Sequence, residues 1–192
     1  MKVNRPYRMK ARAATAEATH RRVLNVVSAL LKKHFRSEIR LEDVAAGAEV
    51  TVQTVLNLFG NRATLLKEGL DDLLRELRAQ RLGANPGDVR GAISVLMDHY
   101  EQFGDLVIRN LAEGADPELI KLGRLGHRRW VQKQFARALE RAETASRRSL
   151  TDALVSACDV YTWKLLRRDM ARSRLEVEAT ILKMVKSIAG ET

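Results

Sequence analysis

The chain has 192 residues and a net charge of +10, with 34 Lys and Arg against 24 Asp and Glu. Hydrophobic residues make up 45% of it, an ordinary share for a globular protein that buries a core. No apolar run approaches the roughly 20 residues of a membrane-spanning helix, and the basic start lacks the apolar centre of a secretory signal. The single cysteine, Cys158, cannot form an internal disulfide and fits a reducing compartment. We therefore expect a cytoplasmic protein without a membrane partner.

The positive charge is concentrated in the first third of the chain. Residues 1–66 hold 12 Lys and Arg against 5 Asp and Glu, which is +7 of the total. Residues 1–14 are predicted to be a flexible basic arm that follows a DNA backbone or enters the minor groove. Its candidate contacts are Arg5, Arg8, Lys10 and Arg12. This placement indicates a polyanionic partner.

Residues 15–34 are predicted to form the first helix, and residues 41–59 hold two shorter helical patterns with a break between them. Leu41, Val44 and Ala48 lie on one face of the first short helix. Thr51 is suited to cap the second. That second helix has an apolar back of Val55, Leu58 and Phe59, and its polar front carries Gln53, Thr54 and Asn57. The arrangement is typical of a helix-turn-helix that reads base edges in the major groove.

The run from Val23 to Leu66 resembles the amino-terminal domain of the TetR family of transcriptional regulators. The similar positions are Val23-Leu24, Val27, Leu30-Leu31, Leu41, Val44-Ala45, Ala48, Val50-Thr51, Val55, Phe59-Gly60 and Leu65-Leu66. Residues 159–169 and 173–174 also resemble the carboxy-terminal domain of many members. The sequence departs from the family at Glu49, where a turn Gly is usual, and at Leu56 and Leu58, where Tyr and His are usual. A positive φ at Glu49 would cost roughly 1 kcal/mol.

The resemblance implies a homodimeric repressor that binds double-stranded DNA at a palindromic operator. A helix-turn-helix domain is expected over residues 15–62, and a ligand-binding and dimerisation domain over residues 63–192. Together with the arm, the predicted DNA-binding residues are Arg40, Thr51, Val52, Gln53, Thr54, Asn57 and Arg62.

The remainder of the chain is predicted to be helical. A leucine stripe indicates a helix over residues 62–81, and a helix capped by Asp88 is expected to end at Gly104. A short apolar segment follows over residues 106–112. Further helices are expected over residues 117–142, 145–169 and 174–189, the last with a Ser173/Glu176 capping box. The prediction is therefore an all-α fold of about nine helices.

Two apolar stripes in residues 63–192 are predicted to enclose a small hydrophobic effector that is neutral or weakly charged. Individually, each of these residues is also suited to an ordinary core. The predicted effector-binding residues are Ile93, Met97, Tyr100, Phe103, Gly123, Gly126, His127 and Trp130.

The last two predicted helices each carry more than one apolar face, so one face is expected to meet a second copy of the chain. The predicted dimer residues are Val160, Trp163, Val177, Ile181, Met184 and Ile188.

No histidine, cysteine and carboxylate spacing indicates a metal site, and no motif indicates catalysis. We therefore expect no metal, no cofactor and no catalytic residue. Two alternatives remain open. The first alternative is a ligand-independent regulator or activator of the same fold. The second is a helical enzyme or interaction module with a vestigial helix-turn-helix.

Overall fold

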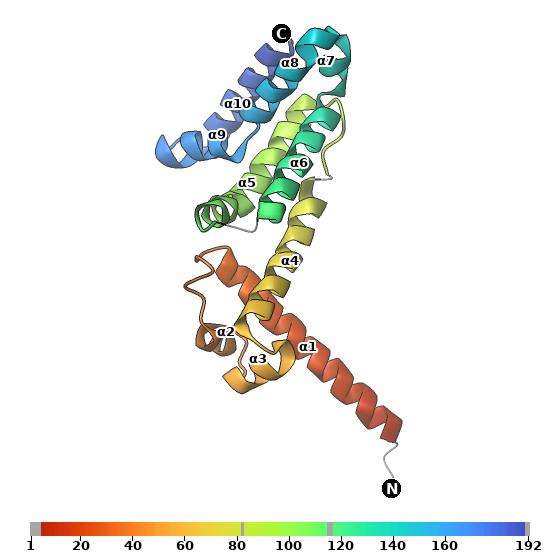
Figure 1. Cartoon of the computed structure of the whole chain (residues 1–192), viewed down its shortest axis with the longest axis vertical. Coiled ribbons are helices and arrows are strands. Elements are labelled where there is room, and N and C mark those ends of the chain that lie inside the picture. The colour runs from red at the N-terminus through yellow and green to blue at the C-terminus, as the bar shows by residue number, and fades with distance from the viewer. Residues whose placement is uncertain (1–4, 82, 115–116, 191–192) are drawn as a thin grey trace. The chain divides into compact units, whose positions relative to one another are not determined.

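A computed structural model describes residues 5–81, 83–114 and 117–190 (Figure 1). Within these ranges the chain forms α-helices α1 to α10 and a short π-helical segment, η1, without a strand. The predicted all-α fold of about nine helices is confirmed. None of the described helices combines the length and the hydropathy that a membrane crossing requires. The chain divides into two compact units between Glu76 and Leu77, and each unit is described by itself.

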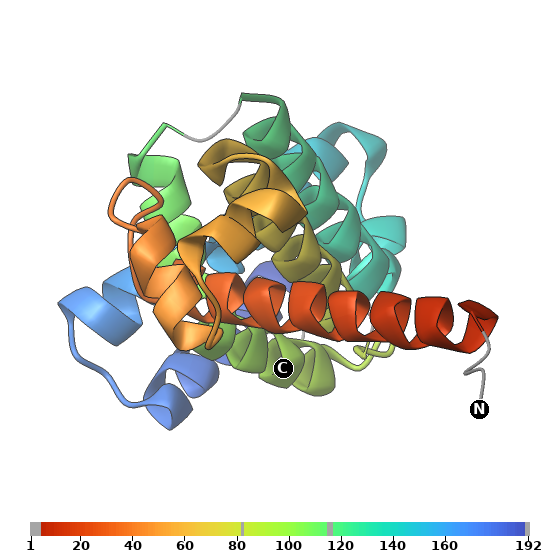
Figure 2. The ribbon, with the colours of Figure 1, turned by 90° about the horizontal axis from the view of Figure 1, so that it is seen from below.

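The first unit contains α1 (Arg5–Leu31), α2 (Leu41–Gly47), α3 (Val52–Phe59) and most of α4 (Arg62–Arg81). Helix α1 begins at Arg5 rather than at residue 15, so the segment expected to be a flexible arm is helical from Arg5 onward. Pro6 lies in the first turn, where its missing N–H breaks no helical bond, and the residues that follow favour helix. The amino-terminal half of α1 projects beyond α2 and α3 (Figures 1 and 2).

Close packing of α1 against α4 sets the extent of this unit. Val27, Leu31, Leu65 and Leu73 are all buried. A Cβ on Gly69 would overlap the Val27 side chain, so a glycine at this position lets the two helices approach. The boundary expected after residue 62 therefore lies inside α4, because the first part of that helix belongs to the core of the first unit.

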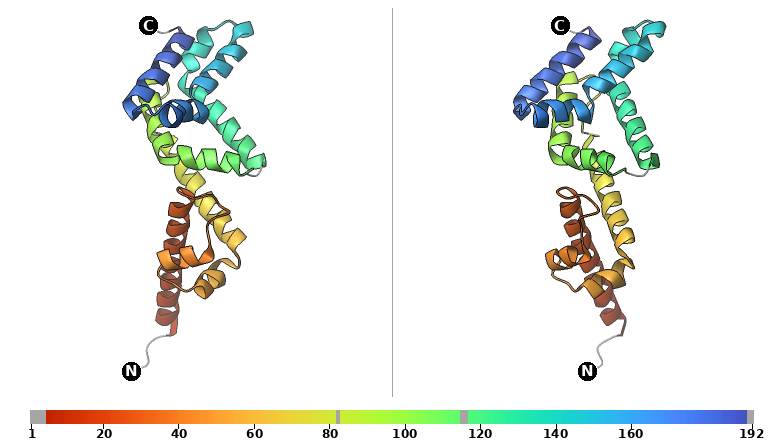
Figure 3. Two further views of the ribbon diagram at one scale, coloured as in Figure 1. Left: turned by 90° about the vertical axis from the view of Figure 1, so that its left-hand side faces the viewer. Right: turned by 60° about the vertical axis from the view of Figure 1, so that its left-hand side comes forward.

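The second unit is a layered bundle of the remaining helices (Figure 3). Its core is formed by buried residues from α5, α6, α7, α8, α9 and α10. The predicted capping box of the last helix is confirmed, with Ser173 N donating to Glu176 Oε2 at 2.8 Å. In chain order the elements are α5 (Val89–Ala112), α6 (Pro117–Gln134), α7 (Ala136–Arg141), α8 (Thr144–Ala157), α9 (Val160–Lys164), η1 (Leu165–Asp169) and α10 (Arg174–Ala189).

Three predicted helix boundaries in this unit differ from the structure. Helix α5 does not end at Gly104 but runs on to Ala112, because Gly104 is buried beneath Trp163, whose ring a Cβ would overlap. The helix predicted over residues 117–142 is interrupted at buried Phe135, where φ is −104° and ψ is 22°. The helix predicted over residues 145–169 is broken after α8, because Asp159 accepts a hydrogen bond from Tyr161 N at 2.9 Å and so starts α9.

Ion pairs join α5 to η1. Arg167 contacts both carboxylate oxygens of Glu101, at 2.8 and 3.2 Å, and Arg168 contacts both oxygens of Asp105, at 3.1 and 2.9 Å. The Arg168 guanidinium also lies 4.6 Å from the centre of the Trp163 ring. Bidentate pairs of this kind fix orientation as well as distance. They hold η1 and α9 against α5.

Candidate nucleic-acid interface and the cluster around Arg81

The turn between α2 and α3 carries the strain that its sequence predicts. Glu49 has a φ of 54°, in the left-handed region that favours glycine. A non-glycine residue there costs roughly 1 kcal/mol. The turn is closed by hydrogen bonds from Ala48 N to Val44 O and from Val50 N to Ala45 O, both 3.0 Å. These bonds and the buried side chain of Ala48 hold the turn in shape.

Helix α3 begins at the predicted cap. Thr54 N donates to Thr51 Oγ1 at 3.1 Å, and the two threonine hydroxyls lie 2.9 Å apart. Val55 and Phe59 are buried against the rest of the unit, which turns the opposite face of α3 outward. Val52 is half-buried, so its contribution to an exposed face is limited.

The outward face of α3 presents two linked amides. Gln53 and Asn57 are exposed, and Gln53 Nε2 donates to Asn57 Oδ1 at 2.9 Å. Amide side chains supply both donors and acceptors, which is the chemistry that distinguishes base edges in the major groove. The structure thus places Gln53 and Asn57 together on one exposed surface of α3, with Thr54 half-buried beside them.

The two arginines predicted to contact phosphate lie in different environments. Arg40 is exposed at the start of α2 and pairs with Asp43 at 3.3 Å. That hydrogen bond and the charge of Asp43 raise the pKa of Arg40 above its usual value. Arg62 is half-buried, and its guanidinium donates to the carbonyls of Ile39 at 2.8 Å, Ser37 at 3.2 Å, and Arg36. Arg62 therefore ties the α1–α2 loop to the start of α4, and a phosphate contact would compete with those bonds.

The basic residues near the start of the chain lie on α1. Lys10 is exposed. Arg5, Arg8 and Arg12 belong to the helix by their backbone, and their side chains lie outside what the structure describes. Their spacing places Arg5, Arg8 and Arg12 on one side of a helix.

His20 links α1 to α3 and α4, and sequence reasoning did not single it out. Its ring stacks on Phe59 with ring centroids 4.5 Å apart and an interplanar angle of 23°. Its Nε2 lies 3.4 Å from Glu68 Oε2. His20 thus braces the end of α3 from behind, a contact that no local pattern indicates.

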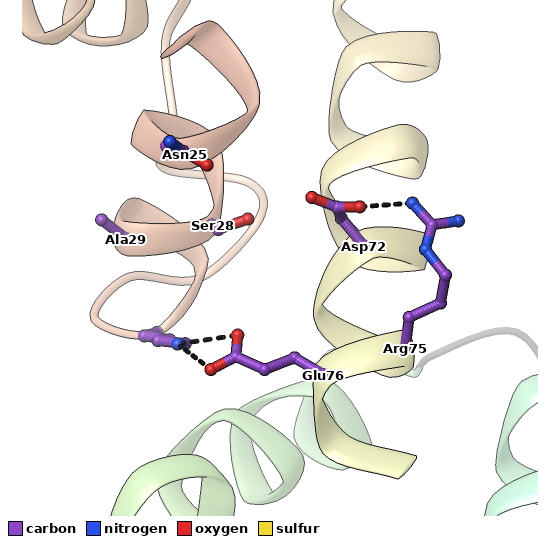
Figure 4. Close-up of a pocket in the computed structure, with 7 residues that line it drawn as sticks. Asn25, Ser28, Ala29, Asp72, Arg75 and Glu76 are labelled. Atoms are coloured by element: carbon purple, nitrogen blue, oxygen red, sulfur yellow. Dashed lines mark hydrogen bonds and ion pairs between the residues drawn. The ribbon is translucent and has the colours of Figure 1, made fainter. Parts of the chain in front are cut away.

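A pocket of about 480 Å³ lies between α1 and α4 in the first unit (Figure 4). Its charged residues pair with one another. Lys32 contacts Glu76 at 3.2 Å, and Arg75 contacts Asp72. Because these charges cancel, the pocket offers no net attraction to a charged ligand.

The predicted effector residues fall into two groups. Six are buried in the second unit: Ile93, Met97, Tyr100, Phe103, His127 and Trp130. Gly123 and Gly126 are exposed on α6, and a Cβ on either would meet nothing within 4 Å. The structure therefore does not bring the two glycines to the buried group, because residues 121–126 of α6 are all exposed and burial begins at His127.

Arg81, the last residue of α4, occupies the space between the buried polar side chains. Its Nη1 lies 3.3 Å from His127 Nδ1, and its Nη2 lies 3.5 Å from the Tyr100 hydroxyl. Its guanidinium carbon lies 5.8 Å from the ring centres of both Tyr100 and Trp130. Trp130 Nε1 in turn donates to the Arg81 carbonyl at 3.2 Å.

Hydrogen bonding assigns the tautomer of His127. Its Nε2 lies 3.2 Å from the Val155 carbonyl, which can only accept, so the proton is on Nε2. Nδ1 is then the acceptor for Arg81. Burial, followed by the charge of Arg81, lowers the pKa of His127 to about 4. The same two causes and the charge of His127 lower the pKa of His99 to about 2. Both rings are neutral at pH 7.

A signal for Arg81 was present in the sequence. The stripe of Leu66, Leu70, Leu73 and Leu77 continues at the next i+4 position with Arg81. A charged residue that prolongs an apolar stripe is directed toward the core. Only the structure shows that aromatic rings and a neutral imidazole receive it.

The predicted dimer residues are mostly part of the protomer core. Val160, Trp163, Val177 and Ile181 are buried among α5, α8 and α10, Ile188 is half-buried and Met184 is exposed. The apolar periodicity was detected correctly, but these four residues face the chain's own core. Large hydrophobic side chains exposed on α9, η1 and α10 are Tyr161, Leu165, Met170, Leu175 and Met184.

Across the residues that the structure describes, no three His, Cys, Asp or Glu side chains gather as a metal site would require. Cys158 is buried, and burial raises the pKa of its thiol to about 12. No protein-family model matches the chain, and no curated protein matches it.

Proposed function

We propose that the protein is a homodimeric, DNA-binding transcriptional regulator of the TetR type, whose second unit responds to a small molecule. The observation that carries this proposal is the exposed Gln53–Asn57 pair on α3, presented by a helix-turn-helix in the most basic part of the chain. Phosphate contacts from basic residues would supply affinity, and the amides would supply sequence preference.

The dimer requires an apolar surface on each protomer. Leu175 is 73% exposed on α10 and is the most exposed large hydrophobic side chain described. We infer a two-fold contact formed by the exposed apolar residues of α9, η1 and α10. An isologous contact of this kind matches a palindromic DNA site, because each subunit then presents the same helix to one half-site.

Response to a ligand is the second part of the proposal. Helix α4 begins at Arg62, which holds the loop before α2, and ends at Arg81, within the buried polar cluster. A ligand that favours one arrangement of this helix would shift the population of DNA-competent dimers. Linkage then requires that the same ligand bind less tightly to the DNA-bound dimer.

A second candidate is a ligand-independent regulator of the same fold. The observation that favours it is the burial of Ile93, Met97 and Phe103, which places protein atoms where an apolar effector was expected. The two candidates share the DNA-binding function and differ only in whether a small molecule changes it.

Selection of bound DNA from a random pool tests the shared function. A regulator of this type yields a palindrome whose half-sites lie about one helical turn, ~34 Å, apart. Failure to enrich any sequence, together with binding that does not weaken as salt rises, would falsify the proposal.

A further inference from the structure

Arg81 differs from the arginines that form ion pairs in the second unit. Arg167, Arg168 and Arg174 each pair with a carboxylate of α5, and Arg128 pairs with Asp152. Within the described part of the chain, Arg81 has no carboxylate partner. Arg81 is half-buried, so its charge loses part of its water without gaining an opposite charge.

One edge of the Arg81 guanidinium is free to bind. Nη1 is occupied by His127 Nδ1, but Nε is buried and has no hydrogen-bond partner. Nη2 makes only a 3.5 Å contact with Tyr100. Nε and Nη2 together form the edge that holds a carboxylate through two parallel hydrogen bonds.

The groups around this edge favour an anion over a cation. His99 and His127 are neutral, so the formal charges that act on the cluster are those of Arg81 and Asp159, and the Asp159 carboxylate accepts its hydrogen bond from Tyr161 N. The guanidinium lies over the rings of Tyr100 and Trp130, so a second cation at those rings would be repelled by Arg81. The Tyr100 hydroxyl donates to the Cys158 carbonyl at 2.8 Å, so the hydrogen bonds to an anion would come from Arg81 and not from Tyr100.

A further polar atom and an apolar lining complete the site. His99 is 1% exposed, its Nδ1 has no partner, and the charge of Arg81 acts on it. Ile93, Met97 and Phe103 are fully buried apolar side chains on α5, the helix that carries His99 and Tyr100, and the ring centre of Phe103 lies 5.6 Å from that of His99. Because Arg81 Nε is buried, a ligand reaches it only when neighbouring side chains move, and flexible Met97 is suited to such movement.

We propose that the cluster around Arg81 binds a carboxylate attached to an apolar body, with the Nε–Nη2 edge of Arg81 as its anchor. This inference rests on the proposed function, and it replaces the neutral hydrophobic effector predicted from the sequence. Binding would form the ion pair that Arg81 lacks. It would also act directly on the end of α4.

The test uses two matched pairs of probes on the full chain. Octanoate and octanamide have the same length, and benzoate and benzamide have the same ring, but only the acids carry a charge. Binding is measured by titration calorimetry in the absence of DNA. We expect at least one acid to bind about 10- to 100-fold more tightly than its amide, as for a hydrogen-bonded ion pair.

Variants locate the binding. Arg81→Met should reduce the affinity of the acid to that of the amide, while Arg78→Met, an exposed arginine on the same helix, should leave it unchanged. Arg81→Lys keeps the charge without the planar edge and should bind with intermediate affinity, which covers the case in which Arg81→Met does not fold. The acid should change the fluorescence of the wild-type protein but not of Trp130→Phe.

Equal affinities for acid and amide, no binding of either acid, or unchanged binding by Arg81→Met and Arg81→Lys would each overturn the inference. The DNA selection is a separate measurement. Enrichment of DNA without carboxylate binding rejects only the anionic site. Carboxylate binding that depends on Arg81, without enrichment of DNA, rejects only the regulator.

Discussion

Gln53 donates a hydrogen bond to Asn57 across one turn of α3, over 2.9 Å between Nε2 and Oδ1. Each amide therefore orients the other before DNA is met. If α3 reads DNA as proposed, the two side chains would act as one unit, since the loss of either leaves its neighbour free to rotate.

Substitution of these amides should change DNA preference in a coupled way. Gln53→Ala or Asn57→Ala should each relax preference at one or two base pairs, by about 1–3 kcal/mol. The double variant should lose less binding free energy than the two single variants lose together, and the difference is a coupling energy of about 0.5–3 kcal/mol. Selected sites and binding constants of the four proteins measure this, with Asn25→Ala as an exposed-amide control on α1. If Gln53→Ala, Thr54→Ala and Asn57→Ala all select the wild-type site, α3 is not the reading helix.

Arg62 should matter for stability before it matters for DNA affinity. Arg62→Met removes bonds to the carbonyls of Ile39 and Ser37 and should destabilise the first unit by about 1–3 kcal/mol. Arg40→Met removes an exposed pair with Asp43 and should leave the stability nearly unchanged, because solvent screens an exposed ion pair. Urea unfolding compares the two variants. Equal stability of Arg62→Met and wild type would contradict the assigned role.

Neutralising the start of α1 should weaken binding to every DNA sequence. A variant with Arg5, Arg8, Lys10 and Arg12 changed to Gln should lower the log–log salt slope by about 0.9 for each phosphate that the variant no longer neutralises. Glutamine preserves helix formation, so the charge is tested without removing the helix. The matched control changes four exposed cations of the second unit, Arg124, Arg129, Arg137 and Lys183, and should leave the slope unchanged.

Stability should fall in mild acid because of buried histidines. His127 and His99 have pKa values of about 4 and about 2 in the folded protein, against 6.5 ordinarily. Below pH 6.5 the unfolded chain binds protons that the folded protein does not, so each histidine lowers the free energy of unfolding by up to about 1.4 kcal/mol per pH unit. The ordinary pKa of Glu101 and Glu176 is 4.5, and their pKa values are lowered in the folded protein, so their effect begins at more acidic pH.

Unfolding at pH 7 and pH 5 measures this dependence. His127→Gln should flatten it, because glutamine does not titrate, whereas His34→Gln at an exposed position should leave it unchanged. A stability that is constant between these pH values would show that the imidazoles are not buried as described.

The proposed subunit contact should be sensitive to charge at Leu175. Leu175→Glu should give a monomer by ultracentrifugation without loss of helicity, because that side chain is 73% exposed. Leu122→Glu, at a leucine that is 55% exposed on α6, is the matched control and should keep the wild-type association state. Ile181→Glu should unfold the second unit instead, since Ile181 is buried in the protomer core. A dimeric Leu175→Glu protein would place the contact elsewhere.

The local sequence pattern was sufficient to predict the all-helical fold, both ends of α3, α4 and α10, and the caps at Thr51 and Ser173. These features depend on periodicity and on hydrogen bonds between residues close in sequence, which a linear reading contains. The left-handed backbone at Glu49 was instead implied by the family resemblance, in which a turn Gly is usual at this position, and the φ of 54° agrees with it.

Tertiary contacts decided the rest. Gly104 resembles a helix end until Trp163, 59 residues later in the sequence numbering, is seen to pack on it. Periodicity shows that Val160, Trp163, Val177 and Ile181 are apolar on one side, but it does not show whether that side meets the protomer's own core or a second copy. In the sequence, Arg81 is a charged residue at the end of a leucine stripe. Only the folded structure places it between Tyr100, His127 and Trp130. Each of these outcomes depends on which residues distant in sequence become neighbours, and no local propensity carries that information.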